Sequence, residues 1–158
     1  MKSEPERHII QAQHMTTNEK KAANMIIRDE RPGDIEEISW ITRTAFEVHP
    51  YGVHTEQYII RELRDSRVLT ISLVAEMEGK VVGHITFSPV RMADCSPDWY
   101  GVGPVSVLPH LQRRGIGTAL VYRGLELPSA RGANGCVLVG DPEYYTRFGF
   151  KNIPGLVH

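Results

Sequence analysis

The stretch GVGPVSVLPHLQRRGIGTALV, residues 101–121, decides the fold of this chain. It predicts an apolar strand, a short basic loop with two glycines, and then an amphipathic helix. Such a loop makes an anion site, because unpaired N–H groups and the positive end of the helix dipole converge on it. Gly115 and Gly117 let a ligand approach the backbone where a Cβ would collide. Arg113 and Arg114 add positive charge, so the stretch predicts a phosphate-binding loop.

Two common phosphate-binding loops are excluded by the residues around these glycines. A Walker A loop needs Lys and then Ser or Thr directly after its last glycine, whereas Gly117 is followed by Thr118. A dinucleotide fingerprint needs glycine or alanine at position 120, which is Leu120. Gly101 and Gly103 do not rescue that fingerprint, since no helix starts directly after them.

Two separate motifs resemble those of the GNAT superfamily of acyl-CoA-dependent N-acyltransferases. Residues 112–117, QRRGIG, resemble its core motif Gln/Arg-x-x-Gly-x-Gly/Ala. Residues 145–150, YTRFGF, resemble its second signature, Tyr-x-x-x-Gly-Phe. Residues 137–145, VLVGDPEYY, are similar to a bacterial branch of small members. The resemblance covers about residues 25–150, with the expected elements in the same order.

The resemblance implies acetyl-CoA as co-substrate and assigns residues to its binding. Backbone N–H groups at the loop would hold the pyrophosphate, namely those of Gln112, Arg113, Arg114, Gly115, Ile116, Gly117 and Thr118. Val105 and Val107 would pair through their backbones with the pantetheine arm. A bulge near Gly103-Pro104 would splay this strand from the strand over 136–139 and open the slot for the arm. The N–H of Val105 would polarise the thioester carbonyl, and Tyr145 would protonate the departing thiolate.

The implied reaction is direct transfer of an acetyl group to a primary amine of a small molecule, peptide or protein, without a covalent enzyme intermediate. Many GNAT enzymes carry a glutamate base on the strand before the loop, where this chain has only Ser106. Six other residues are candidates for that base: Glu47, His49, His54, Glu56, Asp98 and Asp141. A water chain to solvent would also serve. The alternative interpretation of Asp141 is a helix cap, and that of Tyr145 is a residue packed in the core. His84 is expected to be structural.

Two other functions fit parts of the same sequence. A non-catalytic acyl-CoA-binding regulator would explain the missing base. A nucleotide-binding or Rossmann oxidoreductase module would bind NAD rather than coenzyme A.

Length and composition restrict the class of protein. At 158 residues the chain is long enough for one domain with a full core. A formal net charge of −1 argues against a nucleic-acid binder. The two cysteines lack CxxC spacing, so neither a zinc site nor a disulfide framework is expected. No apolar run approaches the ~20 residues of a membrane span, and no secretory leader is visible, so we expect a cytoplasmic protein.

The hydrophobic pattern predicts an α/β fold with a mixed central sheet and helices on both faces. The expected strands cover residues 25–30, 70–78, 81–90, 100–107, 136–139 and 150–153. The expected helices run from Asp34 to about 46, from Thr55 to about 66, from 116 to Pro128, and over 143–148. Asp34 and Thr55 are expected to cap their helices, with Ile59 and Leu63 facing inward.

Both ends of the chain depart from the family pattern. Residues 1–24 are polar and predict a disordered or loosely attached extension, or a partner-binding arm, outside a domain over 25–158. GNAT domains usually end in a two-stranded hairpin after the Gly-Phe signature, whereas only residues 151–158 remain here. Either the hairpin is shortened or the N-terminal extension substitutes for it. An exposed sheet edge would favour a homodimer.

Overall fold

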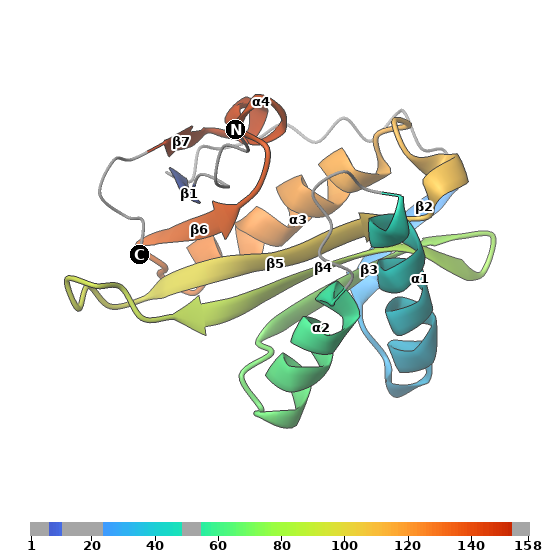
Figure 1. The fold of residues 1–158 in the computed structure, drawn as a ribbon, viewed down its shortest axis with the longest axis horizontal. Coiled ribbons are helices and arrows are strands. Elements are labelled where there is room, and N and C mark those ends of the chain that lie inside the picture. Colours follow the sequence, from blue (N-terminus) through green and yellow to red (C-terminus); the bar gives the residue numbers. More distant parts are fainter. Residues whose placement is uncertain (1–6, 11–23, 49–54, 153–158) are drawn as a thin grey trace.

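The computed structural model describes residues 7–10, 24–48 and 55–152, which form a seven-stranded mixed sheet with helices on both faces (Figure 1). The strands are β1 (Arg7–Ile10), β2 (Met25–Asp29), β3 (Ile71–Met77), β4 (Lys80–Val90), β5 (Trp99–Val107), β6 (Gly135–Val139) and β7 (Phe150–Asn152). The helices are α1 (Ile35–Glu47), α2 (Glu56–Asp65), α3 (Ile116–Ala130) and α4 (Pro142–Tyr145), with short 3₁₀ turns at Pro32–Asp34, Pro109–Leu111 and Thr146–Phe148. Within these residues, the sheet order is β2-β3-β4-β5-β6-β1-β7, and only β5 and β6 run parallel.

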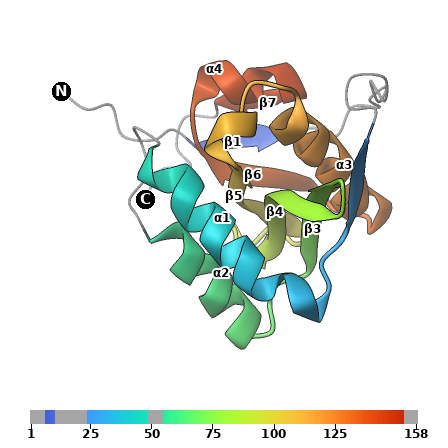
Figure 2. The ribbon, with the colours of Figure 1, turned by 90° about the vertical axis from the view of Figure 1, so that its right-hand side faces the viewer.

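Two apolar clusters hold the helices to opposite faces of the sheet (Figure 2). Leu120 of α3 packs with Ile85 and Phe87 of β4 on one face. Ile38 of α1 packs with Val74 of β3 on the other. The period-2 alternation of β3 and β4 sends successive side chains to the two clusters. The prediction of a mixed sheet covered on both faces is confirmed.

A bulge interrupts β5 at the predicted place. Val105 pairs with Ile85 of β4, whereas Val102 pairs with Phe87. Three steps along β5 therefore match two steps along β4, so β5 carries one extra residue at Gly103-Pro104. Proline has no N–H to donate to the ladder, which makes this a favourable place for the irregularity.

Beyond the bulge, β5 separates from β6. The two strands pair only over 99–101 of β5 and 135–137 of β6, although β5 continues to Val107 and β6 to Val139. The described part of β6 therefore leaves one side of residues 102–107 unpaired, as the resemblance to the family implied.

The helix predictions need three corrections. Ile60, 3% exposed, faces inward in α2, whereas Ile59 is 45% exposed. Pro128 does not end α3 but lies in its last turn, where the helix runs on to Ala130. Asp34 and Thr55 occupy the N-cap positions without a side-chain cap hydrogen bond.

Asp34 has a different partner from the one its position suggested. Arg28 donates to both of its carboxylate oxygens, at 2.7 and 3.1 Å, and the N–H of Arg31 donates at 2.7 Å. The hydrogen bonds from Arg28 lower the pKa of Asp34. This ion pair ties the start of α1 to β2.

Residues 7–10 were expected in a loosely attached extension, but they form β1. This strand pairs antiparallel with β6 on one side and with β7 on the other. The N-terminal segment therefore supplies a strand between β6 and β7. The rest of 1–23 lies outside the described residues, as does the loop over 49–54.

Candidate active site

The predicted phosphate-binding loop lies between β5 and α3. A 3₁₀ turn over Pro109–Leu111 follows β5, and α3 begins at Ile116. Gly115 is the N-cap residue with φ +87°, a conformation that favours glycine. Its carbonyl accepts the N–H of Ala119 at 3.0 Å, the first bond of the helix. The N–H groups of residues 116–118 point out of the helix end, as the geometry of a helix N-terminus requires.

Tyr144 of α4 lies over this helix end, and nothing in the sequence predicted this contact. A Cβ built on Gly117 would be 3.1 Å from the Tyr144 hydroxyl, so a larger residue there would push this hydroxyl back by a few tenths of an ångström. The hydroxyl also bonds the Thr118 side chain. The guanidinium of Arg147 lies 4.7 Å from the centre of the Tyr144 ring. Tyr144 thereby brings a third arginine close to the loop that already carries Arg113 and Arg114.

The backbone of β5 beyond the bulge faces away from β4 at two positions. The N–H of Leu108 donates to the carbonyl of Val82 at 3.0 Å, so this antiparallel pair is hydrogen-bonded. Such pairs alternate along the ladder. The N–H and C=O groups of Val105 and Val107 therefore point to the side that β6 has left. The Gln112 side chain uses one of them, donating to the Val107 carbonyl at 3.0 Å.

The ring of Tyr145 packs against the ring of Tyr144 and against Gly140, the residue that follows β6. A Cβ on Gly140 would be 2.5 Å from its ring, and the ring makes edge contacts with Tyr144 and Phe150 at centroid distances of 4.9 and 5.7 Å. Burial, together with Tyr144 and Asp141, raises the pKa of Tyr145 above its ordinary value. The hydroxyl is protonated at neutral pH and can donate.

The four candidate bases within the described residues lie on different elements. Glu47 is exposed at the end of α1, and Asp98 is exposed in a turn. Asp141 accepts the N–H of Glu143 at 2.9 Å and is the cap of α4. Glu56 is buried at the start of α2, 7% exposed. The remaining two, His49 and His54, lie outside the described residues.

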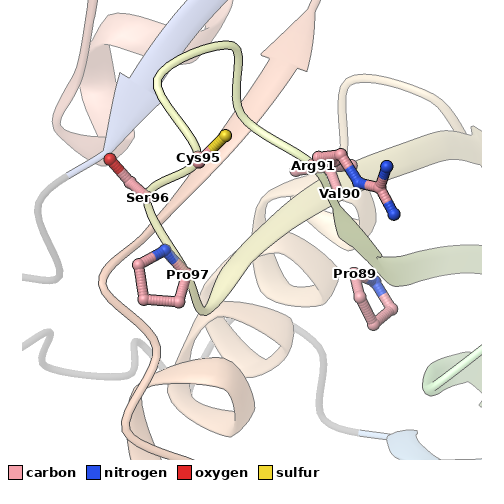
Figure 3. A pocket seen from close by; sticks show the side chains of 6 residues that line it. All are labelled: Pro89, Val90, Arg91, Cys95, Ser96 and Pro97. Atoms are coloured by element: carbon pink, nitrogen blue, oxygen red, sulfur yellow. The ribbon is translucent and has the colours of Figure 1, made fainter.

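A shallow hollow of about 540 Å³ lies at the opposite end of β5 from the loop. The turn between β4 and β5 lines it, and Figure 3 shows its six side chains, Pro89, Val90, Arg91, Cys95, Ser96 and Pro97. Nine residues of β5 separate the hollow from the phosphate-binding loop. It therefore belongs to a different end of the sheet.

Two kinds of site are absent from the described part of the chain. No group of three or more His, Cys, Asp or Glu side chains there could hold a metal ion. No helix there is long and apolar enough to cross a membrane.

Comparison with known proteins gives concordant matches. Residues 34–150, well over half of the chain, match the acetyltransferase (GNAT) family. The uncharacterised N-acetyltransferase YhbS of Escherichia coli K12 is 36% identical over 128 residues, covering 80% of this chain and 74% of YhbS.

Two solved structures extend these matches. A GNAT family acetyltransferase from Brucella melitensis in complex with acetyl-CoA is 51% identical, with a TM-score of 0.77 over 80% of this chain and 82% of that one. Escherichia coli YhbS in complex with CoA is 32% identical, with a TM-score of 0.74 over 84% and 77% of the two chains.

Proposed function

Because the chain belongs to the GNAT family of acetyltransferases, we propose that it transfers the acetyl group of acetyl-CoA to a primary amine of a small molecule, peptide or protein. The observation that carries this proposal is the separation of β5 from β6 directly before the phosphate-binding loop. One strand end thus offers free backbone groups to an extended arm, and the next loop offers N–H groups to a phosphate.

The residues present fit acetyl-CoA in two ways. Gly115 and Gly117 keep the helix end open, and the N–H groups of residues 112–118 would hold the pyrophosphate. Arg113 and Arg114 flank the loop, and Arg147 is held near it by Tyr144. Two relatives with at least 32% identity were crystallised with acetyl-CoA or CoA. These observations favour coenzyme A over NAD.

The chemistry would be direct attack of the amine on the thioester. The outward N–H of Val105 would polarise the thioester carbonyl as negative charge develops on its oxygen. Val107 would hold the pantetheine arm alongside β5, as an added strand is held. Tyr145 would supply a proton to the sulfur, since its hydroxyl is protonated at neutral pH. No side chain needs to form a covalent intermediate.

The acceptor would enter on the side of the sheet away from the loop. The segments over 47–54 and 93–99 would select it. The alternative is a regulator that binds acyl-CoA without turnover. Only the enzyme would release thiol from acetyl-CoA when an amine is present.

Thiol release from acetyl-CoA, measured with a colorimetric reagent across a panel of amines, tests the proposal. Tyr145→Phe should lower kcat about 10- to 100-fold with little change in coenzyme affinity, since only the proton donor is lost. Tyr122→Phe is the matched control, because Tyr122 is a tyrosine outside residues 112–118 that makes an edge contact with Phe148, 4.9 Å between ring centres. Tight coenzyme binding without turnover on any amine would favour the regulator instead.

A further inference from the structure

The face of β4 beneath α1 and α2 carries a row of buried polar side chains. His84, Thr86 and Ser88 occupy alternate positions, so they share this face. Their exposures are 0, 0 and 5%. Each keeps one atom without a hydrogen-bond partner: His84 Nδ1, Thr86 Oγ1 and Ser88 Oγ. Buried polar atoms are rarely left unpaired, so three in one row indicate a role beyond packing.

The other nitrogen of His84 is tied to a network that reaches the surface. His84 Nε2 lies 2.7 Å from Ser72 Oγ, and Ser72 donates to Glu30 Oε1 at 3.1 Å. Arg64 holds both oxygens of the same carboxylate, with Nη2 2.8 Å from Oε1. The side chains of Glu30 and Arg64 are 15 and 23% exposed. His84 is thus connected to solvent through a carboxylate.

These contacts determine which ring nitrogen carries the proton. Ser72 has one hydroxyl proton, and Glu30 accepts it. Ser72 Oγ must then accept a hydrogen bond from His84, so the proton of the neutral ring is on Nε2. Nδ1 therefore carries a free lone pair. Burial lowers the pKa of His84 to about 4, with Arg64 of α2 acting in the same direction and Glu30 and Asp34 opposing it.

The free lone pair lies close to the bulge. A Cβ on Gly103 would be 1.8 Å from Thr86 Oγ1, so the Thr86 hydroxyl lies directly against the point where β5 leaves β6. His84 precedes Thr86 by two residues in β4, so the backbones of the two residues are ~7 Å apart. It pairs across the strands with Ser106, the residue after Val105. One bridging water would connect Thr86 Oγ1 with His84 Nδ1.

We propose, on the basis of the proposed function, that His84 accepts the proton of the acceptor amine through the Thr86 hydroxyl. As the C–N bond forms, the thioester C–S bond breaks and its electron pair leaves on sulfur, which takes a proton from Tyr145. The N–H proton moves to Thr86, and the proton of Thr86 moves through the water to Nδ1. Ser72 and Glu30 stabilise the resulting imidazolium. The proton returns along the row to solvent, and Tyr145 regains its own from solvent.

His84→Gln tests this directly, because the glutamine amide can still donate to Ser72 while the basic nitrogen is lost. We expect kcat to fall about 100-fold at pH 7, with acetyl-CoA affinity measured by calorimetry unchanged. The deficit should shrink as pH rises, because hydroxide can replace the missing base. A structural defect would lower kcat by the same factor at every pH.

Thr42→Val is the matched control. Thr42 is a fully buried residue of α1, which covers the same face of the sheet. Its hydroxyl donates to the Ile38 carbonyl at 2.7 Å and lies 3.3 Å from Ser106 Oγ. Its replacement should lower the melting temperature and leave kcat within about twofold of wild type. If His84→Gln does not fold, Ser72→Ala should lower kcat about tenfold, with the same recovery at high pH.

The outcomes separate this inference from the proposed function. Wild-type protein that binds acetyl-CoA and acetylates no amine overturns the proposed function and this inference with it. Wild-type turnover matched by His84→Gln at every pH overturns this inference alone. So does a ¹⁵N NMR spectrum of the wild-type imidazole at pH 7 that shows the proton on Nδ1.

Discussion

At the scale of single residues, position matters more than residue type. Gly115 and Gly132 both adopt positive φ, +87° and +79°, and a Cβ on either would meet nothing within 4 Å. Gly115 begins α3 at the phosphate-binding loop, whereas Gly132 lies beyond the other end of the same helix. The two glycines share the left-handed backbone conformation and lie at opposite ends of α3.

Gly115→Glu should therefore weaken acetyl-CoA binding at least about 100-fold, equal to about 2.7 kcal/mol. The carboxylate would lie where the pyrophosphate is expected and would repel it. Gly132→Glu costs a similar amount of backbone strain and should leave the affinity unchanged. Calorimetric titration of both folded variants checks this. Equal affinities in the two variants would contradict the assigned pyrophosphate site.

His84 should also make stability depend on pH. Its pKa is about 4 in the folded chain and about 6.5 when exposed. The unfolded chain therefore binds more protons as pH falls from 6.5 towards 4, and the stabilising contribution, complete above pH 6.5, is lost over this window. Between pH 7 and pH 5 the free energy of unfolding should fall by about 2 kcal/mol from this group. Urea denaturation at both pH values should show a difference smaller by that amount in His84→Gln.

At the scale of elements, one close approach determines how α3 sits on the sheet. A Cβ on Gly124 would be 2.3 Å from the ring of Phe87. The glycine lets the middle of α3 approach β4, which seals the core behind the phosphate-binding loop. Nothing in the helical pattern of α3 distinguishes this glycine from a merely tolerated one.

Gly124→Ala should destabilise the protein by a net ~1–2 kcal/mol. Alanine favours the helix by about 1 kcal/mol, but the collision with a buried ring costs more, because the core has no room to move. Gly33→Ala is the control, since nothing lies within 4 Å of its Cβ. Its stability should stay within about 0.5 kcal/mol of wild type in urea denaturation. A stabilised Gly124→Ala would show that α3 is free to shift.

At the scale of the whole molecule, the N-terminal strand completes the sheet. β1 lies between β6 and β7, and in the described chain β7 pairs with no other strand. The strand therefore joins residues 7–10 to both β6 and β7 (Figure 1).

Deleting residues 1–10 should lower the melting temperature and expose the edge of β6. An unpaired edge accepts strands from other chains, so the shortened protein should also form concentration-dependent dimers. Thermal unfolding and sedimentation at several concentrations check both effects. A shortened protein with unchanged melting temperature and mass would show that β1 contributes nothing to the sheet.

Local chemistry in the sequence was enough to predict the central part of the fold. The Asp141 cap of α4 and the bulge at Gly103-Pro104 were each predicted, because a cap hydrogen bond and a missing donor depend on a few neighbouring residues. The assignment of catalytic and coenzyme-binding residues came instead from the resemblance to the family.

Only the tertiary structure decided which distant residues meet. The hydrogen-bond network of Glu30, Arg64, Ser72 and His84 joins α2, β3 and β4 to the residue that follows β2, and no spacing along the chain predicts it. β1 pairs with residues more than a hundred positions away. Period and propensity act over one or two turns, whereas pairing at such separations depends on burial and sheet register, which exist only once the chain has folded.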